Sequence, residues 1–188
     1  MTDHSVAVWW PSHPLLGFVG QSVGPREYER QRPFIGPAGQ EIRSWLRVVG
    51  LDPDEDIFWT NVTMEFHPGE PNYVPPAKEI KAAIPELEAQ MKQVGVRGVV
   101  LVGGPASHLA FKGTMRAMQG SRGLFAGLPT WACYHPSAAL RAQTLQEYNR
   151  IQGMALEVLR EAASVAHGED MPEVVLPEPV YVKGVEIL

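Results

Sequence analysis

The sequence contains very little cysteine and no long hydrophobic run. Cys133 is the one cysteine among 188 residues, so the chain cannot form an internal disulfide or a cysteine-ligated metal or iron–sulfur site by itself. No stretch approaches the roughly 20 apolar residues of a membrane span, and no basic segment precedes an apolar core at the N-terminus. We therefore expect a cytoplasmic protein without a membrane anchor.

Acidic residues are missing from one long interval. Between Met91 and Gln146 there is no Asp or Glu, whereas six Lys and Arg residues occur there, although the whole chain carries −5. A basic region within an acidic protein indicates a polyanionic partner such as nucleic acid. The alternative is that the basic half only balances the acidic half.

Four apolar runs that do not alternate are expected to form strands: residues 15–20, 57–62, 98–103 and 129–134. Helical segments are expected at 38–49, 77–94, 106–118 and 138–166. Continuous apolar strands that alternate with helices predict an α/β fold, a three-layer α/β/α sandwich around a central four-stranded parallel sheet. We expect one domain over residues 1–170, and a tail at 171–188 that forms an edge strand, binds a protein partner or is partly disordered.

Polar residues or glycines follow each expected strand. Gln21 and Ser22 follow the first strand, Asn61 ends the second, Gly104 follows the third and His135 follows the fourth. Ligands of open parallel sheets bind beyond the carboxyl ends of the strands, so these four ends predict a shared site.

His135 lies in the segment PTWACYHPSAALR, residues 129–141. Pro136 prevents His135 from continuing into a helix, and Ser137 is a natural N-cap for the residues that follow. This pattern is typical of a catalytic corner. From this segment alone, a histidine that simply ends a strand is an equal alternative.

Four motifs stand at the expected strand ends and beside them: GQSVGPREYERQRPFIGPAGQ at 20–40, WTNV at 59–62, LVGGPASHLAF at 101–111 and YHPSAALR at 134–141. Together they resemble the uracil-DNA glycosylase superfamily, most closely the thermophile-type branch called family 4. The resemblance implies a monofunctional DNA glycosylase. Such an enzyme flips uracil or a 5-substituted uracil out of single- or double-stranded DNA, hydrolyses its N-glycosidic bond and leaves an abasic site.

The resemblance also implies residue roles. Asn61 would match the O4 and N3–H groups of uracil, with Phe34 stacked on the base. His135 would donate a hydrogen bond to the uracil O2 and stabilise the departing anion. The expected DNA-phosphate contacts are Ser137, Arg141 and Gly104.

The first motif departs from the family pattern. Where family members usually read Gly-Glu-Ala-Pro-Gly, this chain has Gly-Gln-Ser-Val-Gly at residues 20–24. Gln21, with Ser22 beside it, can orient a water but cannot take its proton, so we expect a slow enzyme or one with a different water-activating group. Glu27 is the nearest remaining carboxylate and the candidate substitute. The alternatives are a catalytically weakened module that binds DNA or protein, and an enzyme acting on free nucleotides.

Two further departures concern cofactor and substrate. Ala83 and the segment containing Trp9 and Trp10 replace cysteines that hold the branch's iron–sulfur cluster, so we expect no cluster, no other metal, and an N-terminal arm closed by aromatic packing. Gly24 stands where some relatives place a tyrosine against C5 of uracil. We therefore expect an open wall at Gly24 that admits 5-substituted uracils.

Overall fold

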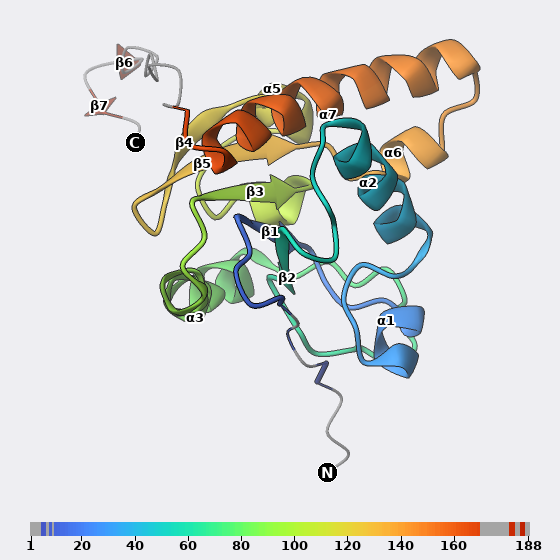
Figure 1. Ribbon diagram of the computed structural model, residues 1–188. Helices are drawn as coiled ribbons and strands as arrows, with labels where there is room; N and C mark the ends of the chain where they lie inside the picture. The colour runs from blue at the N-terminus through green and yellow to red at the C-terminus, as the bar shows by residue number, and fades with distance from the viewer. Residues whose placement is uncertain (1–4, 7, 9, 170–180, 183–184, 187–188) are drawn as a thin grey trace.

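The central sheet has five strands in the order β2-β1-β3-β5-β4 in the computed structural model, which describes residues 5–6, 8, 10–169, 181–182 and 185–186 (Figure 1). The strands are β1 (Leu16–Gly20), β2 (Ile57–Asn61), β3 (Gly98–Val102), β4 (Arg122–Phe125) and β5 (Leu128–Cys133). β1, β2, β3 and β5 are parallel, and β4 is antiparallel to β5.

The expected α/β architecture is confirmed, but the sheet has five strands and not the four that were expected. β4 is joined to β5 by Ala126 and Gly127, both with positive φ, the geometry of a tight two-residue hairpin. β4 was missed because two of its four residues are exposed, so it lacks the apolar run that marks a buried strand.

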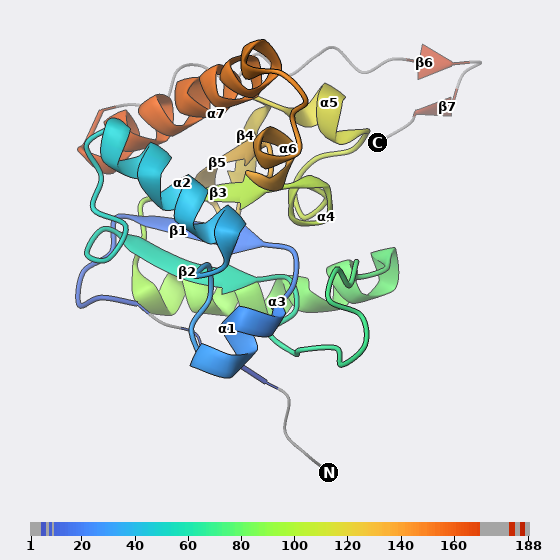
Figure 2. The same cartoon turned by 90° about the vertical axis from the view of Figure 1, so that its right-hand side faces the viewer.

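Helices cover both faces of the sheet. The helices α2 (Pro37–Val48) and α7 (Leu145–Ala166) lie on one face, and α3 (Ala77–Val94) and α4 (Gly104–Ser107) on the other (Figure 2). Alternate strand residues feed two separate cores: Phe18 and Trp59 pack with the first pair of helices, Val19 and Phe58 with the second. Burial on both faces explains why the parallel strands are continuously apolar.

Two segments that were each expected to form one helix contain two. Residues 106–118 are divided between α4 and α5 (Met115–Met118), and residues 138–166 between α6 (Ser137–Leu140) and α7. Thr114 and Thr144 are the N-caps of α5 and α7, and each accepts a hydrogen bond from a backbone N–H three residues ahead. These caps start new helices within the expected ones. The remaining helix is α1 (Pro25–Arg30).

The N-terminal arm packs beside β2. Val6 is buried and donates a backbone hydrogen bond of 2.8 Å to Met64 O. Trp10 lies edge-on to Phe58 with 5.7 Å between ring centroids, in line with the expected aromatic packing of this arm. Trp9 lies outside the described residues.

The described parts of the tail are two short strands. β6 (Tyr181–Val182) and β7 (Val185–Glu186) pair antiparallel with each other in a separate two-stranded sheet. Within the described residues they therefore do not extend the central sheet as an edge strand. None of the helices in the described ranges combines the length and the apolar character that crossing a membrane requires.

Candidate active site

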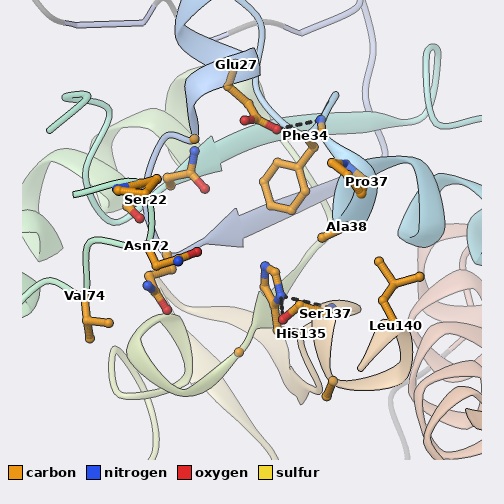
Figure 3. A pocket seen from close by; sticks show the side chains of 18 of the residues that line it. Ser22, Glu27, Phe34, Pro37, Ala38, Asn72, Val74, His135, Ser137 and Leu140 are labelled. Carbon is orange, nitrogen blue, oxygen red and sulfur yellow. Dashed lines mark hydrogen bonds between the residues drawn. The ribbon is translucent and has the colours of Figure 1, made fainter. Parts of the chain in front are cut away.

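A cavity of about 930 Å³ opens at the carboxyl ends of the parallel strands (Figure 3). All nine residues proposed from the sequence line it: Gln21, Ser22, Gly24, Phe34, Asn61, Gly104, His135, Ser137 and Arg141. They come from segments that follow four strands, which is the position expected for a site in a parallel sheet. The structure brings these residues together, and their individual roles stay predictions.

The ring of His135 points into this cavity below Phe34 (Figure 3). Its Nδ1 lies 2.7 Å from Ser137 Oγ and accepts the backbone N–H of Ser137 at 3.2 Å. Because Nδ1 acts as an acceptor, the proton of the neutral ring is carried on Nε2. Burial, and secondly the positive charge of Arg141, lower the pKa of His135 to about 4. At neutral pH the histidine is thus an uncharged donor through Nε2.

Ser137 has a different local role from the one expected. The N-cap of α6 is Pro136, and the Ser137 side chain makes no capping bond. Its hydroxyl and its amide both contact His135 instead, so Ser137 orients the imidazole. Pro136 adopts a helical conformation, with φ −56° and ψ −26°, which moves the start of the turn one residue earlier than the serine pattern suggests.

Phe34 is held in an unusual conformation. Its φ is +56°, which is uncommon for a bulky residue and requires support from its surroundings. Arg43 Nε donates to Phe34 O at 3.0 Å, and the ring packs on Trp59 with 4.7 Å between centroids. A Cβ on Gly39 would lie 2.1 Å from Phe34 O, so glycine is required there. The arrangement presents a fixed aromatic face to the cavity.

The side chains of Asn61 and Phe34 both lie against Gly20. A Cβ on Gly20 would lie 2.3 Å from Asn61 Oδ1 and 2.6 Å from Phe34 Cζ, so both proposed base-binding side chains use the space that this glycine leaves. Asn61 is only 5% exposed, and its Nδ2 donates to Met64 Sδ at 3.6 Å. Met64 therefore orients the amide, with Oδ1 on the Gly20 side. The sequence did not suggest this role for Met64.

Gln21 and Ser22 share one backbone partner. Gln21 Nε2 and Ser22 Oγ each donate a 2.7 Å hydrogen bond to Tyr73 O. Tyr73 is itself fixed, because its ring stacks on His67 at 3.6 Å and its hydroxyl donates to Glu79 at 2.6 Å. No hydrogen bond to Gln21 Oε1 is formed within the described part of the chain, so both side chains offer acceptor atoms to a water.

Glu27 lies beside Gly24, at the wall that was expected to be open. Its Oε1 accepts the backbone N–H of Gly36 at 2.7 Å. A Cβ on Gly24 would lie only 2.5 Å from Glu27 Oε2, and both residues line the cavity. A carboxylate therefore borders the cavity beside Gly24, and the admission of 5-substituted uracils at this wall stays a prediction.

With this geometry in place, comparison with known proteins decides the family. The family model described as "Uracil DNA glycosylase superfamily" matches residues 10–158. The chain belongs to the uracil-DNA glycosylase superfamily. This match spans every element that lines the cavity, so the resemblance of the separate motifs is confirmed over the whole site.

Several individual relatives are enzymes of the type-4 branch of this superfamily. A type-4 uracil-DNA glycosylase of Pyrobaculum aerophilum is 30% identical over 68% of this chain and 69% of the relative. A type-4 enzyme of Thermotoga maritima is 30% identical over 78% of this chain and 75% of the relative. A DNA polymerase of Bacillus phage SP01 is 26% identical over 65% of this chain, but the match covers 13% of that polymerase.

The residues of this superfamily member do not fit an iron–sulfur cluster. The one cysteine of the sequence, Cys133, is fully buried in β5, and burial raises the pKa of its thiol to about 12. Ala83 is partly buried against apolar neighbours on the α3 side of the sheet. Among the described residues there is also no group of three or more His, Cys, Asp or Glu placed to hold a metal ion.

Besides the predicted Arg141, the cavity lining includes two exposed residues that the sequence did not single out, Arg26 and Leu140. Leu140 in α6 is 46% exposed and lines the cavity together with Arg26 and Arg141. Leu140 belongs to the motif YHPSAALR at 134–141, and that motif is the signal that could have identified it.

Proposed function

We propose that the protein hydrolyses the N-glycosidic bond of uracil rotated out of DNA. The observation that carries this proposal is the convergence of Asn61, Phe34 and His135 on one cavity. Family membership and the names of the type-4 relatives support it. A protein that only bound phosphates would need none of these three side chains.

Base recognition follows from the oriented amide of Asn61. Its Oδ1 can accept N3–H of uracil, and the hydrogen on Nδ2 that is not directed at Met64 can donate to O4. Cytosine presents a donor at N4 and an acceptor at N3, so it meets the wrong atom at both positions. A two-point match of this kind discriminates by about 1–3 kcal/mol.

Bond cleavage requires stabilisation of a departing uracil anion, while the sugar gains oxocarbenium-like character. His135, neutral and protonated on Nε2, would donate a hydrogen bond to O2 as negative charge develops there. Its donor is held in place before the reaction by the contacts with Ser137. No lysine is among the described residues that line the cavity, so we propose hydrolysis without a lyase step.

Water activation is the weaker half of the proposed mechanism. Gln21 Oε1 and Ser22 Oγ would accept hydrogen bonds from the attacking water and orient it towards the sugar. Neither group takes up a proton at neutral pH, and general-base assistance is worth about 10²–10⁴-fold. We therefore propose a slow glycosylase.

Glu27 bears on which 5-substituted uracils are accepted. Its Oε2 lies beside Gly24, whereas Oε1 is engaged by Gly36. A 5-hydroxymethyl group could donate a hydrogen bond to this carboxylate, but the methyl group of thymine could not. We propose that 5-hydroxymethyluracil is released and thymine is not, and undetectable release of 5-hydroxymethyluracil beside ready release of uracil would reject this.

The central test is base release from single-stranded oligonucleotides that carry uracil or cytosine at the same position. Strands are cleaved at abasic sites with alkali, and an untreated portion reports any lyase step. We expect release of uracil alone, and loss of release in Asn61→Ala.

If the wild type binds the oligonucleotide but releases nothing and Gln21→Glu restores release, the protein is a weakened binding module. If the affinity for the oligonucleotide does not change with salt concentration, the substrate is a small molecule and not a polymer.

A further inference from the structure

A second cavity adjoins the proposed active site. It has a volume of about 740 Å³ and lies between the N-terminal part of α3, the helix α4 and the segment that follows α4. In Figure 2 both α4 and this end of α3 lie on the right-hand side of the molecule. We call this cavity the flanking groove, and its apolar floor includes Ile80, Ile84 and Phe111.

The flanking groove is continuous with the proposed active site. Val74 and Gly104 line both cavities, so these two residues form the ridge between them. Val74 is 61% exposed on this ridge. A DNA strand whose flipped nucleotide enters the first cavity would cross this ridge and place a neighbouring nucleotide over the groove.

The lining of the groove includes two cationic side chains, Lys81 and Lys112. Lys81, His108 and Lys112 line it, and no acidic residue does so among the described residues. All three are exposed, and within the described part of the chain neither lysine forms an ion pair. Two free ammonium groups beside an apolar floor complement a backbone phosphate and an unstacked base.

Phe111 adds an aromatic ring to the lining of the groove. It is half-buried, and a Cβ on Gly123 would lie 2.9 Å from Phe111 Cε1. β4 therefore supports one side of the ring closely. A supported aromatic ring beside lysines is the combination with which proteins bind single-stranded nucleic acid without reading its sequence.

We propose that the flanking groove binds an unpaired nucleotide next to the excised one in the same DNA strand, with its base on the apolar floor and its phosphate between Lys81 and Lys112. The proposal rests on DNA being the substrate. It assigns the groove a preference for single-stranded over fully paired DNA, because a base held in a duplex cannot reach the floor.

The test compares two double variants that each remove two positive charges. Lys81→Ala/Lys112→Ala alters the groove. Lys92→Ala/Arg160→Ala alters exposed residues that line neither cavity. Binding of a labelled single-stranded oligonucleotide, with and without uracil, is followed by fluorescence anisotropy over a range of salt. Loss of the one phosphate contact that Lys81 and Lys112 share reduces the slope of log K against log salt by about 0.7 for a single strand, and the control variant should keep the wild-type slope.

Stacking is tested with Phe111→Leu, which retains apolar volume but removes the π-face. We expect about fivefold weaker binding of the single strand and no change for a fully paired duplex. An abasic spacer beside the uracil should weaken wild-type binding similarly and should add nothing in Phe111→Leu.

The binding and base-release measurements separate the groove proposal from the proposed function. Equal salt slopes for the two double variants, or an equal effect of Phe111→Leu on single strand and duplex, overturn the groove proposal. If groove variants bind the strand less tightly but the wild type releases no uracil, the groove stands and the proposed function falls. If uracil is released normally by the groove variants with unchanged binding, the proposed function stands alone.

Discussion

The ends of β5 and β1 build opposite halves of the proposed site in different ways. After β5, His135 is oriented by Ser137, which lies two residues ahead in the chain. After β1, Gln21 and Ser22 are oriented by the carbonyl of Tyr73, more than fifty residues away. His135 forms the leaving-group half of the site, and a local contact orients it. Gln21 and Ser22 form the water half, and their orientation depends on how the distant loop that carries Tyr73 packs.

The two halves share one electrostatic property. His135 is neutral because burial lowers its pKa, and Gln21 and Ser22 are neutral by their chemistry. The first half keeps a well-placed donor, and the second has no group that can take a proton. The leaving-group half should therefore supply most of the catalysis.

The largest effect is expected when the leaving-group half is broken. His135→Ala removes the Nε2 donor, and loss of one such donor lowers rates by about 10²–10³-fold. Single-turnover base release measures this, and binding of the uracil oligonucleotide should stay near the wild-type value because Phe34 and Asn61 remain. A rate within fivefold of the wild type would show that His135 is only a strand-end histidine.

A smaller and opposite effect is expected from a carboxylate in the water half. Gln21→Glu introduces a general base, but it also replaces the donor to Tyr73 O with a group that cannot donate. General-base assistance of about 10²–10⁴-fold, reduced by a lost hydrogen bond of about 0.5–1.5 kcal/mol, leaves a gain of at least about tenfold.

Gln21→Met is the matched control for that variant. It removes the same hydrogen bond without adding a carboxylate, so it isolates the cost of releasing the loop. We expect single-turnover release to be about fivefold slower than in the wild type. If Gln21→Glu is as slow as Gln21→Met, the water is not activated from this position.

The same contrast explains which parts of the site were predictable from the sequence. His135, Asn61 and Phe34 lie in compact motifs, and strand ends are marked by local apolar runs, so all three could be placed on one edge of the sheet. The anchoring of Gln21 by Tyr73 and the orientation of Asn61 by Met64 could not be predicted. Both depend on tertiary contacts that leave no periodic or compositional signal.

The errors in the fold prediction have similar physical causes. β4 was missed because an exposed edge strand is not an apolar run. Two long helices were expected where Thr114 and Thr144 begin new ones, because the helical sequence pattern continues past these cap residues and hides the break. The position of Glu27 beside Gly24 could not be predicted either, because a missing side chain does not reveal which residue lies next to it.

A modest effect is expected when the orientation of His135 is loosened. Ser137→Ala removes the hydroxyl contact with Nδ1 but keeps the backbone N–H bond. A single hydrogen bond is worth about 0.5–1.5 kcal/mol, so release should slow about threefold. Ser44→Ala, on an exposed face of α2, should have no effect on the same assay, and a loss as large as that of His135→Ala would mean that Ser137 contacts the substrate.

The smallest effect should be that of pH on the wild type. The pKa of His135 is lowered to about 4, so the ring is already neutral at pH 5, and Gln21 and Ser22 do not titrate. Single-turnover release should change by less than about twofold between pH 5 and 8 and should fall below pH 4 as His135 is protonated.

The unfolded chain binds a proton on this histidine near its ordinary pKa of about 6.5, so stability should decline as the pH falls from 6.5 towards 4. Gln21→Glu should add an acidic limb near the ordinary glutamate pKa of about 4.3. A wild-type inflection near pH 6.5 would show that His135 is solvated and that the two halves are not both neutral.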